Sequence, residues 1–421
     1  MSPLAVVRGR TFKSVREHRN YRLYFAGQAV SFTGTWMQQI AASWLILSLT
    51  HSPVAVGALA LCQLLPITVL GLFVGTVLDR YDLRRTVMKT EAFSMLNAAA
   101  LATLTLTGVV NVWEIYLLAV VQGVVGAVDA PARHSLVFQM VGPDDLPNAV
   151  ALSSSLGTIA RILGPAAGGA VVALAGAGVA FAVNAASFLA ILVSLLAMDP
   201  SKFVLKASDR RSRVLGGAID ALRFVAASPR AGIAFVAVFA LATFSFNFNV
   251  LLPLVADRTL HSGAQVFGLI AAIFGAGALC GAMINATLGH ASLRLLLGGA
   301  GGFGLFELLL APQHSLAAVC VILFATGITY ILWGTNALSV LQLEAPEHLR
   351  GRAASLYFFA FQGGAPLGGL FAGWLTSAGG TQLAFTVGGV VALTTSVAGI
   401  LHLRRTARQP VETASATSAI A

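Results

Sequence analysis

Residues 53–78 read PVAVGALALCQLLPITVLGLFVGTVL, contain no charged side chain, and run directly into DRYDLRR at 79–85. About 20 apolar residues are enough for a helix to cross the hydrocarbon core of a bilayer. A charged cluster is costly inside that core, so DRYDLRR marks the point where the segment leaves it. This stretch therefore predicts a transmembrane helix that ends in a charged loop.

Long apolar stretches separated by short breaks continue along the chain. Of its 421 residues, 57% are hydrophobic and only 10% are charged, whereas soluble domains have about 25% charged residues. This composition excludes a soluble enzyme, a nucleic-acid-binding protein and a disordered protein. It predicts an all-α polytopic membrane protein with twelve transmembrane helices in two six-helix halves. The expected spans lie near 21–49, 53–78, 86–109, 113–139, 146–174, 178–198, 230–256, 264–288, 292–311, 315–342, 352–377 and 382–402.

Residues 199–229 form the one long polar interruption and divide the spans into six and six. Within them, 212–227 (SRVLGGAIDALRFVAA) is typical of an amphipathic helix lying on the membrane surface; a flexible linker is the alternative. The expected parts are a cytoplasmic N-terminal arm (1–20), a six-helix bundle (21–198), a cytoplasmic linker (199–229), a second six-helix bundle (230–403) and a disordered cytoplasmic tail (404–421).

The positive charge lies almost entirely on one side of these spans. The net charge is +10, and all but two of the 26 Lys and Arg residues fall on the side that holds the termini and the middle linker. Arg258 falls on the other side, and Arg161 falls inside a span. Because loops rich in Lys and Arg stay in the cytoplasm, we expect a multi-pass protein of the bacterial cytoplasmic membrane with both termini cytoplasmic.

The two halves repeat short sequence features. His51-Ser52 followed by Gly57 recurs as His261-Ser262 followed by Gly268, and Gly168-Gly169 recurs as Gly368-Gly369. Parallel repeats of six spans are typical of a large class of secondary transporters, in which the substrate site lies between the halves near mid-bilayer.

The charged loop and two further segments carry a family resemblance. The pattern G-x-x-x-D-R followed by a basic pair resembles the inner-loop motif of the major facilitator superfamily, with Asp82 in place of the usual glycine. Together with RNYRLYFAGQAVSFTGTW at 19–36 and AVDAPAR at 127–133, it is similar to the drug-antiporter-3 branch. That branch includes macrolide efflux pumps and the enterobactin exporter. The resemblance implies a monomeric secondary transporter, not an enzyme, and makes this loop a cytoplasmic gate motif of Gly75, Asp79, Arg80, Asp82, Arg84 and Arg85.

Elementary electrostatics favours the same role for the gate motif. Asp79 can accept from the N-terminus of a neighbouring helix, where the helix dipole favours an anion. Arg80 and Arg84 can pair with carboxylates on adjacent spans and so clamp the cytoplasmic side shut. The alternative is that these charges only set the topology.

A second motif lies in the fifth span. Gly164-Pro165-Ala-Ala-Gly168-Gly169 resembles the G-P-x-x-G-G motif associated with exporters of this superfamily. Proline among small residues gives a kink and close packing against a facing helix, and packing alone is the competing interpretation.

Arg161 lies near the middle of the fifth span, where an unpaired guanidinium costs at least about 3 kcal/mol. It should therefore face a cavity or a carboxylate. Counting back from the turn near 140–146 places it within about one helical turn of Asp129, which could equally pair with Arg133 at i+4. We expect Arg161 to belong to a structural or coupling network, with direct substrate contact as the alternative.

Few carboxylates within the spans can take up a proton. Glu91 could join the clamp of Arg80 and Arg133, and Glu307 lies on the usually peripheral ninth span, facing lipid or an interface. Asp129 is the preferred protonation candidate by elimination, although Ala119 stands where related antiporters carry an arginine. The expected coupling network is Glu91, Asp129, Arg133 and Arg161, with protons as the coupling ion.

By family analogy, the first, fourth, seventh and tenth spans line the substrate cavity. Uncharged aromatic and amide side chains suit a largish amphipathic ligand, although helix packing explains each residue about as well. The candidates are Gln28, Phe32, Trp36, Gln38, Gln39, Phe246, Asn247, Asn249, Tyr330, Trp333 and Asn336.

Other classes of mechanism have little support in the sequence. It contains no G-x-x-x-x-G-K-[ST] nucleotide-binding loop, no CxxC pair among its three cysteines, and no His/Cys/Asp cluster with metal-ligand spacing. We expect no cofactor, no bound metal and no nucleic acid. An exporter of a drug-like or siderophore-like molecule is the main interpretation, and an importer of a small metabolite on the same fold is the alternative.

Overall fold

The computed structural model describes residues 12–78, 81–204 and 222–406. In these ranges every regular element is a helix. The first half contains α2 (Lys13–Glu17), α3 (Arg19–Thr50), α4 (Pro53–Leu78), α5 (Leu83–Leu106), α6 (Val112–Ala175) and α7 (Ala177–Leu196), followed by the short helix η1 (Pro200–Lys202).

The second half begins with a helix that changes its winding twice. This helix comprises α9 (Pro229–Ala240), the π-helical turn η2 (Leu241–Ser245), α10 (Phe248–Leu254) and the π-helical turn η3 (Val255–Thr259). The remaining elements are α11 (Ala264–Leu288), α12 (Leu293–Leu310), α13 (Leu316–Glu344), η4 (Glu347–Leu349) and α14 (Arg350–Thr406).

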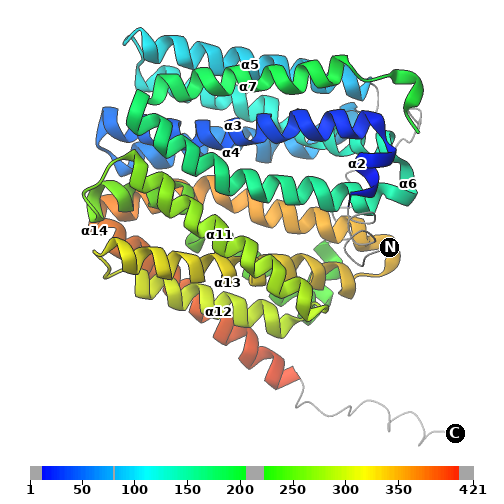
Figure 1. Ribbon diagram of the computed structural model, residues 1–421. Coiled ribbons are helices and arrows are strands. Elements are labelled where there is room, and N and C mark those ends of the chain that lie inside the picture. Colours follow the sequence, from blue (N-terminus) through cyan, green and yellow to red (C-terminus); the bar gives the residue numbers. More distant parts are fainter. Residues whose placement is uncertain (1–11, 79–80, 205–221, 407–421) are drawn as a thin grey trace, which may run out of the picture.

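The long helices lie alongside one another in two groups, α2 to α7 and α9 to α14 (Figure 1). The groups meet where α6 packs against α11 and where α4 packs against α14. The short helix α2 lies at one end of the bundle, which we call the terminal end, and we call the opposite end, with loops 51–52 and 260–263, the distal end (Figure 1). Helices side by side satisfy their own backbone hydrogen bonds, which is what a bilayer requires.

Two glycines divide the longest helices. Gly142 in α6 has φ 73° and ψ −178°, and Gly380 in α14 has φ 73° and ψ 179°. A side chain strongly disfavours this region of backbone space, so each glycine lets the chain leave one arm and start the next. The breaks fall where short loops are predicted, between spans four and five and between spans eleven and twelve.

The membrane character of the helices agrees with the sequence. Eight helices in the described ranges are long and apolar enough to cross a membrane, and two of these are the divided α6 and α14. The fold is therefore all-α and polytopic, and the count of twelve spans stays a prediction. Of the predicted amphipathic helix, only 222–227 is described, and it is helical. Residues 1–11 of the arm and 407–421 of the tail lie outside the described ranges.

Glycines repeated between the halves meet in pairs across their boundary. A Cβ atom built on Gly57 would lie 2.6 Å from the Gly369 carbonyl oxygen, and one on Gly169 would lie 2.7 Å from the Gly268 Cα. Because backbone occupies the space of any larger side chain, small residues permit this close approach. Both contacts lie toward the distal end, so the halves are closed there.

At the terminal end, the short helix α2 is tied to the turn that follows Gly142. The Asp145 carboxylate lies 2.6 Å from Lys13 Nζ and 2.9 Å from His18 Nε2. Glu17, His18 and Asp145 also bring potential metal-ligand atoms within 4.8 Å of one another, but Lys13 already holds one Asp145 oxygen. The cluster therefore serves first as a polar attachment of α2.

Replacing Asp145 by asparagine should lower the thermal unfolding midpoint at neutral pH by about 1–2 °C, since partly exposed ion pairs are weak. Hydrogen bonds from Lys13 and His18 hold the pKa of Asp145 below its ordinary value. A lowered pKa gives stabilisation that is present at neutral pH and lost as the pH falls through the folded-state value. Melting curves from neutral to acidic pH should show this loss in the wild type and less of it in Asp145→Asn. Asp144→Asn alters an exposed neighbour and is the control, which should lose stability with falling pH as the wild type does.

Candidate functional site

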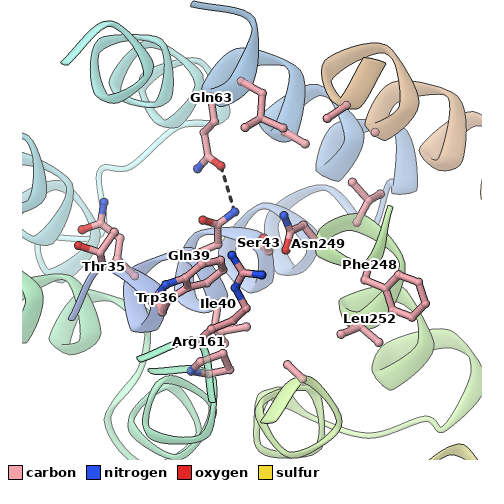
Figure 2. Close-up of a pocket in the computed structure, with 18 of the residues that line it drawn as sticks. Thr35, Trp36, Gln39, Ile40, Ser43, Gln63, Arg161, Phe248, Asn249 and Leu252 are labelled. Carbon is pink, nitrogen blue, oxygen red and sulfur yellow. Dashed lines mark hydrogen bonds between the residues drawn. The ribbon is translucent and has the colours of Figure 1, made fainter. Parts of the chain in front are cut away.

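A cavity of about 450 Å³ lies between the two halves, within the range typical of ligand sites. Its walls come from α3, α4, both arms of α6 and α7 on one side. On the other side they come from Phe246 to Leu252, α11, α13 and α14. Figure 2 shows Trp36 and Gln39 of α3, Gln63 of α4 and Arg161 of α6 reaching into the same space.

Seven of the predicted cavity residues lie on this wall. They are Trp36, Gln38, Gln39, Phe246, Asn247, Asn249 and Tyr330. The first and seventh spans supply most of them, as the family analogy implies. The second, fifth, sixth, eighth and eleventh spans also line the cavity, so the expected set of four spans is incomplete.

The other four predicted residues lie elsewhere. Trp333 is fully buried between Phe303 and Tyr330. Asn336 is also buried and donates to Asn285 Oδ1 at 2.8 Å. Each belongs to the packing of the second half, because a helix presents only a narrow stripe to the cavity.

Gln28 and Phe32 are displaced toward the terminal end of α3. Gln28 is 2% exposed and buried within the first half. Phe32 lies beneath the Arg133 guanidinium, whose carbon is 5.3 Å from the ring centroid. Neither is among the lining residues of the cavity.

Several polar wall residues are absent from the predicted set. Gln63 is one of them, and its Oε1 accepts a hydrogen bond from Gln39 at 3.4 Å, the contact drawn in Figure 2. Asn184 donates to Gln38 Oε1 at 2.6 Å. Gln362 also lines the cavity. An isolated amide within an otherwise apolar span was the available signal, since such residues usually face a protein interior or cavity.

Arg161 projects into the cavity and does not join the predicted coupling network. Its guanidinium carbon lies 4.9 Å from the Trp36 ring centroid, and Nη1 lies 3.5 Å from the Tyr330 hydroxyl, at the long limit of a hydrogen bond. Its buried Nε has no hydrogen-bond partner in the described residues. Within the same ranges, no carboxylate oxygen lies within 4.0 Å of the guanidinium. Among the described residues Arg161 therefore forms no ion pair with Asp129, and of the two positions expected for it, a cavity or a carboxylate, it takes the cavity.

Planar groups cross the boundary between the halves at this point. The ring of Tyr330 stacks on Phe246 with centroids 4.3 Å apart and planes 3° apart. The Arg161 plane lies between this pair and Trp36. Aromatic and guanidinium planes of this kind favour flat or aromatic parts of a ligand.

The other three members of the predicted network come together deep in the first half. Arg133 Nη2 lies 2.5 Å from Glu91 Oε1, a close ion pair without hydrogen-bond angles, and Arg133 Nε binds Asp129 Oδ2. Thr90 donates to Asp129 Oδ1 at 2.6 Å, and Glu91 is fully buried. We call Glu91, Asp129 and Arg133 the carboxylate triad. It contains two carboxylates for one guanidinium.

The gate motif caps helices in the part that the structure describes. Asp82 accepts from the Arg85 backbone N–H at 2.7 Å and so caps α5. Arg84 donates to the carbonyls of Leu195 and Leu196 at 2.8 and 3.1 Å. Cations are favourable at a helix C-terminus, so Arg84 caps α7, and among the described residues it has no carboxylate partner of the kind predicted. Gly75 lies within α4, and Asp79 and Arg80 fall outside the described residues.

The glycine-proline motif joins three helices. A Cβ atom on Gly164 would lie 2.4 Å from Trp36 Cβ, and one on Gly168 would lie 3.0 Å from the Met37 carbonyl oxygen. Pro165 lines the cavity, while Gly169 meets Gly268 of α11. The motif therefore packs the second arm of α6 against α3 and α11 beside Arg161.

Glu307 differs from its predicted lipid-facing or interface-facing position. It is fully buried, and neither carboxylate oxygen has a hydrogen-bond partner among the described residues. A Cβ atom on Gly388 of α14 would lie 3.0 Å from Glu307 Oε2, so the carboxyl points between α12 and α14.

Comparison with known proteins places this geometry among transporters. Residues 11–418 match the family pattern described as "transmembrane secretion effector". The chain is 28% identical to the enterobactin exporter EntS of Escherichia coli O139:H28 over 82% of each chain. It is 26% identical to the staphyloferrin A transporter of Staphylococcus aureus, over 62% of this chain and 66% of that protein.

Solved structures show the same fold at low sequence identity. A nucleoside transporter, NupG, matches with a TM-score of 0.69 and 14% identity, over 91% of this chain and 98% of its own. A bacterial homologue of the human lysosomal transporter Spinster, in an inward-facing and unoccupied conformation, matches with a TM-score of 0.67 and 14% identity over 95% of both chains. Likeness at this identity concerns the arrangement of helices alone.

Proposed function

Because the chain belongs to the transmembrane secretion effector family of the major facilitator superfamily, we propose that it exports a small amphipathic organic molecule across the cell membrane. It is a membrane transporter of the secretion-effector type. The observation that carries the export proposal is the cavity between the halves. Its size and its mixed aromatic and amide walls suit one organic ligand.

The charge of the wall narrows the ligand class. Of the lining residues that the structure describes, Arg161 alone is charged. A guanidinium with a free Nε donor favours a carboxylate, phenolate or carbonyl oxygen on the ligand. Relatives named for enterobactin and staphyloferrin A make a siderophore-like molecule the first candidate and a drug-like compound the second.

Alternating access follows from how the halves meet. The close glycine contacts, Gly57 with Gly369 and Gly169 with Gly268, lie at the distal end. We place both termini in the cytoplasm, from the distribution of Lys and Arg. In this arrangement the distal end is the outer gate and is closed, and transport requires it to open. The gate motif and the linker 199–229 then lie on the cytoplasmic side.

The carboxylate triad supports proton coupling. If both carboxylates were ionised, the buried triad would carry an uncompensated negative charge, which is costly in a medium without water. One carboxyl group therefore takes up a proton in this conformation. We keep Asp129 as the first candidate because the neutral hydroxyl of Thr90 contacts it, and an acid can donate there as readily as accept.

In proteoliposomes with an imposed pH gradient, the purified protein should carry enterobactin, and Asp129→Asn should reduce gradient-driven flux about tenfold or more. The substitution keeps the shape of the side chain but removes the exchangeable proton. Flux without a gradient should change much less. Asp144→Asn, at an exposed position, is the matched control. Undiminished gradient-driven flux in Asp129→Asn would remove this residue from the proposal.

The direction of transport separates export from import on the same fold. A strain lacking the gene should retain a secreted product or become sensitive to the exported compound. Loss of growth on a nutrient, with no retained product, would favour the importer.

A further inference from the structure

A second buried carboxyl group lies apart from the carboxylate triad. Glu307 is three residues from the distal end of α12, and its side chain has no exposed surface. Glycines let the neighbouring helix approach it closely. A Cβ atom on Gly304 would lie 2.6 Å from the Gly389 carbonyl oxygen, and one on Gly388 would lie 3.0 and 3.2 Å from the two Glu307 oxygens.

No positive charge of the described residues lies close enough to compensate this carboxyl group. The helices packed against α12 are α9, α13 and α14, and in the described ranges none of their Lys, Arg or His nitrogens lies within 4.0 Å of it. Most of their charged groups lie at the terminal ends of the helices. The titratable residues of these elements are Arg230, Cys320, Tyr330, Glu344, Arg350, Arg352, Tyr357, His402, Arg404 and Arg405, and η2 contributes none.

Burial without a partner decides the charge of Glu307 in this conformation. Burying an ionised carboxylate without a partner costs several kcal/mol or more of free energy. The neutral acid costs much less. Glu307 therefore carries a proton while its surroundings stay as they are here.

Those surroundings include the winding change in the seventh span. The carbonyl oxygen of Phe244 lies 3.2 Å from the same Cβ position on Gly388 that faces Glu307. Ser245 donates to the Gly388 carbonyl oxygen at 2.7 Å. Both residues belong to the π-helical turn η2, and such turns are frequent at functional sites.

The segment that follows η2 enters the cavity directly. Phe246 and Asn247 have non-helical backbone angles, and both line the cavity. Phe246 also stacks on Tyr330, whose hydroxyl lies 3.5 Å from Arg161 Nη1. A movement of this segment therefore changes the cavity wall and the enclosure of Glu307 together.

We propose that Glu307 is a proton-binding site of the second half, which releases its proton when the segment from η2 to Asn247 moves and the distal end opens. The inference rests on the proposed function only in requiring two conformations of the bundle. By linkage, the protonated acid stabilises the closed distal end, and deprotonation at higher pH favours opening.

A cysteine reporter tests this without a substrate. Val250 is 2% exposed and lies at the boundary of the halves, in a buried cluster with Val56 and Leu59 of α4. After Cys62, Cys280 and Cys320 are replaced by alanine, maleimide should label Val250→Cys in lipid nanodiscs at a rate that rises with pH. The rate should be divided by that of Val109→Cys, an exposed distal position that reports the reactivity of the thiol alone.

Between pH 6 and pH 9, we expect the corrected rate to rise about fivefold or more with Glu307 present, and to stay flat in Glu307→Gln, which mimics the protonated acid. Glu307→Asp, which keeps an acid, should retain the rise at a shifted midpoint and guards against a folding defect. Asp144→Asn, at an exposed position outside both proton sites, should retain the rise unshifted. A flat wild-type profile, or an unchanged rise in Glu307→Gln, would overturn the proposal. Failure of enterobactin transport would leave this result standing and refute only the proposed substrate.

Discussion

Replacing Gly169 by leucine should hold the distal end open and reduce transport about tenfold or more. A Cβ atom at this position would lie 2.6 Å from the Ala264 carbonyl oxygen and 2.7 Å from the Gly268 Cα. These are backbone atoms of α11 and its N-terminal turn, so no flexible side chain can move away. Overpacking of this kind costs about 1–3 kcal/mol, and the cost falls only on the closed state. A shift of that size changes a two-state population about 5-fold to 150-fold.

Labelling of Val250→Cys measures the same change directly, and Gly169→Leu should raise its rate at neutral pH. Gly298→Leu is the matched control, because a Cβ atom on that exposed glycine of α12 would meet no atom within 4 Å. Both proteins should be compared at equal membrane abundance. Wild-type transport together with wild-type labelling in Gly169→Leu would show that the glycine contact does not govern the distal gate.

Replacing Arg161 by glutamine should weaken substrate binding about 10-fold to 100-fold, the loss expected for a hydrogen bond to a charged group. Glutamine keeps a polar side chain but loses the charge and the planar face that lies over Trp36. The affinity of Arg161→Lys for substrate should lie between those of the wild type and Arg161→Gln, since lysine keeps only the charge. Titration of the purified proteins with enterobactin checks this, and Arg294→Gln, at an exposed position of α12, is the control.

Thermal stability separates this role from a structural ion pair. Removing one partner of a buried ion pair is strongly destabilising because the other charge stays buried. Arg161 has no such partner in the described part of the chain, so Arg161→Gln should leave the unfolding midpoint unchanged or slightly higher. A large fall in the midpoint, with binding unaltered, would contradict a substrate-facing Arg161.

The ends of the helices could be predicted because hydropathy reports what lipid requires. The expected spans 53–78 and 264–288 coincide with α4 and α11. The repeated glycines Gly57 and Gly268 each meet a glycine of the other half, although the repeat by itself predicted only two related halves. Exclusion of charge from the bilayer and close packing of small residues act locally, and a single sequence records both.

The rotation of each helix could not be predicted in the same way. Tyr330 and Trp333 lie three residues apart, yet only Tyr330 lines the cavity. In lipid, both faces of a helix are apolar, so periodicity does not indicate which one faces the partner helices. Arg161 shows the same limit, because counting residues from the turn estimates depth in the membrane but not the direction of the side chain.

Glu307 was misplaced for a different reason. Family analogy treated its span as peripheral, whereas the general rule for an ionisable residue inside a membrane favours the protein interior. The close contact of Gly304 with α14 depends on tertiary packing, and it encloses the carboxyl group. Here the physical rule was the better guide.

The central claim is that one cavity between the halves, with Arg161 on its wall, carries an organic molecule across the membrane. The most direct test is uptake of enterobactin by inside-out membrane vesicles that contain the protein, with a pH gradient imposed and without ATP. We expect uptake well above that of vesicles lacking the protein, and loss of most of it in Arg161→Gln but not in Arg294→Gln. Equal uptake by wild-type and Arg161→Gln vesicles would contradict the claim.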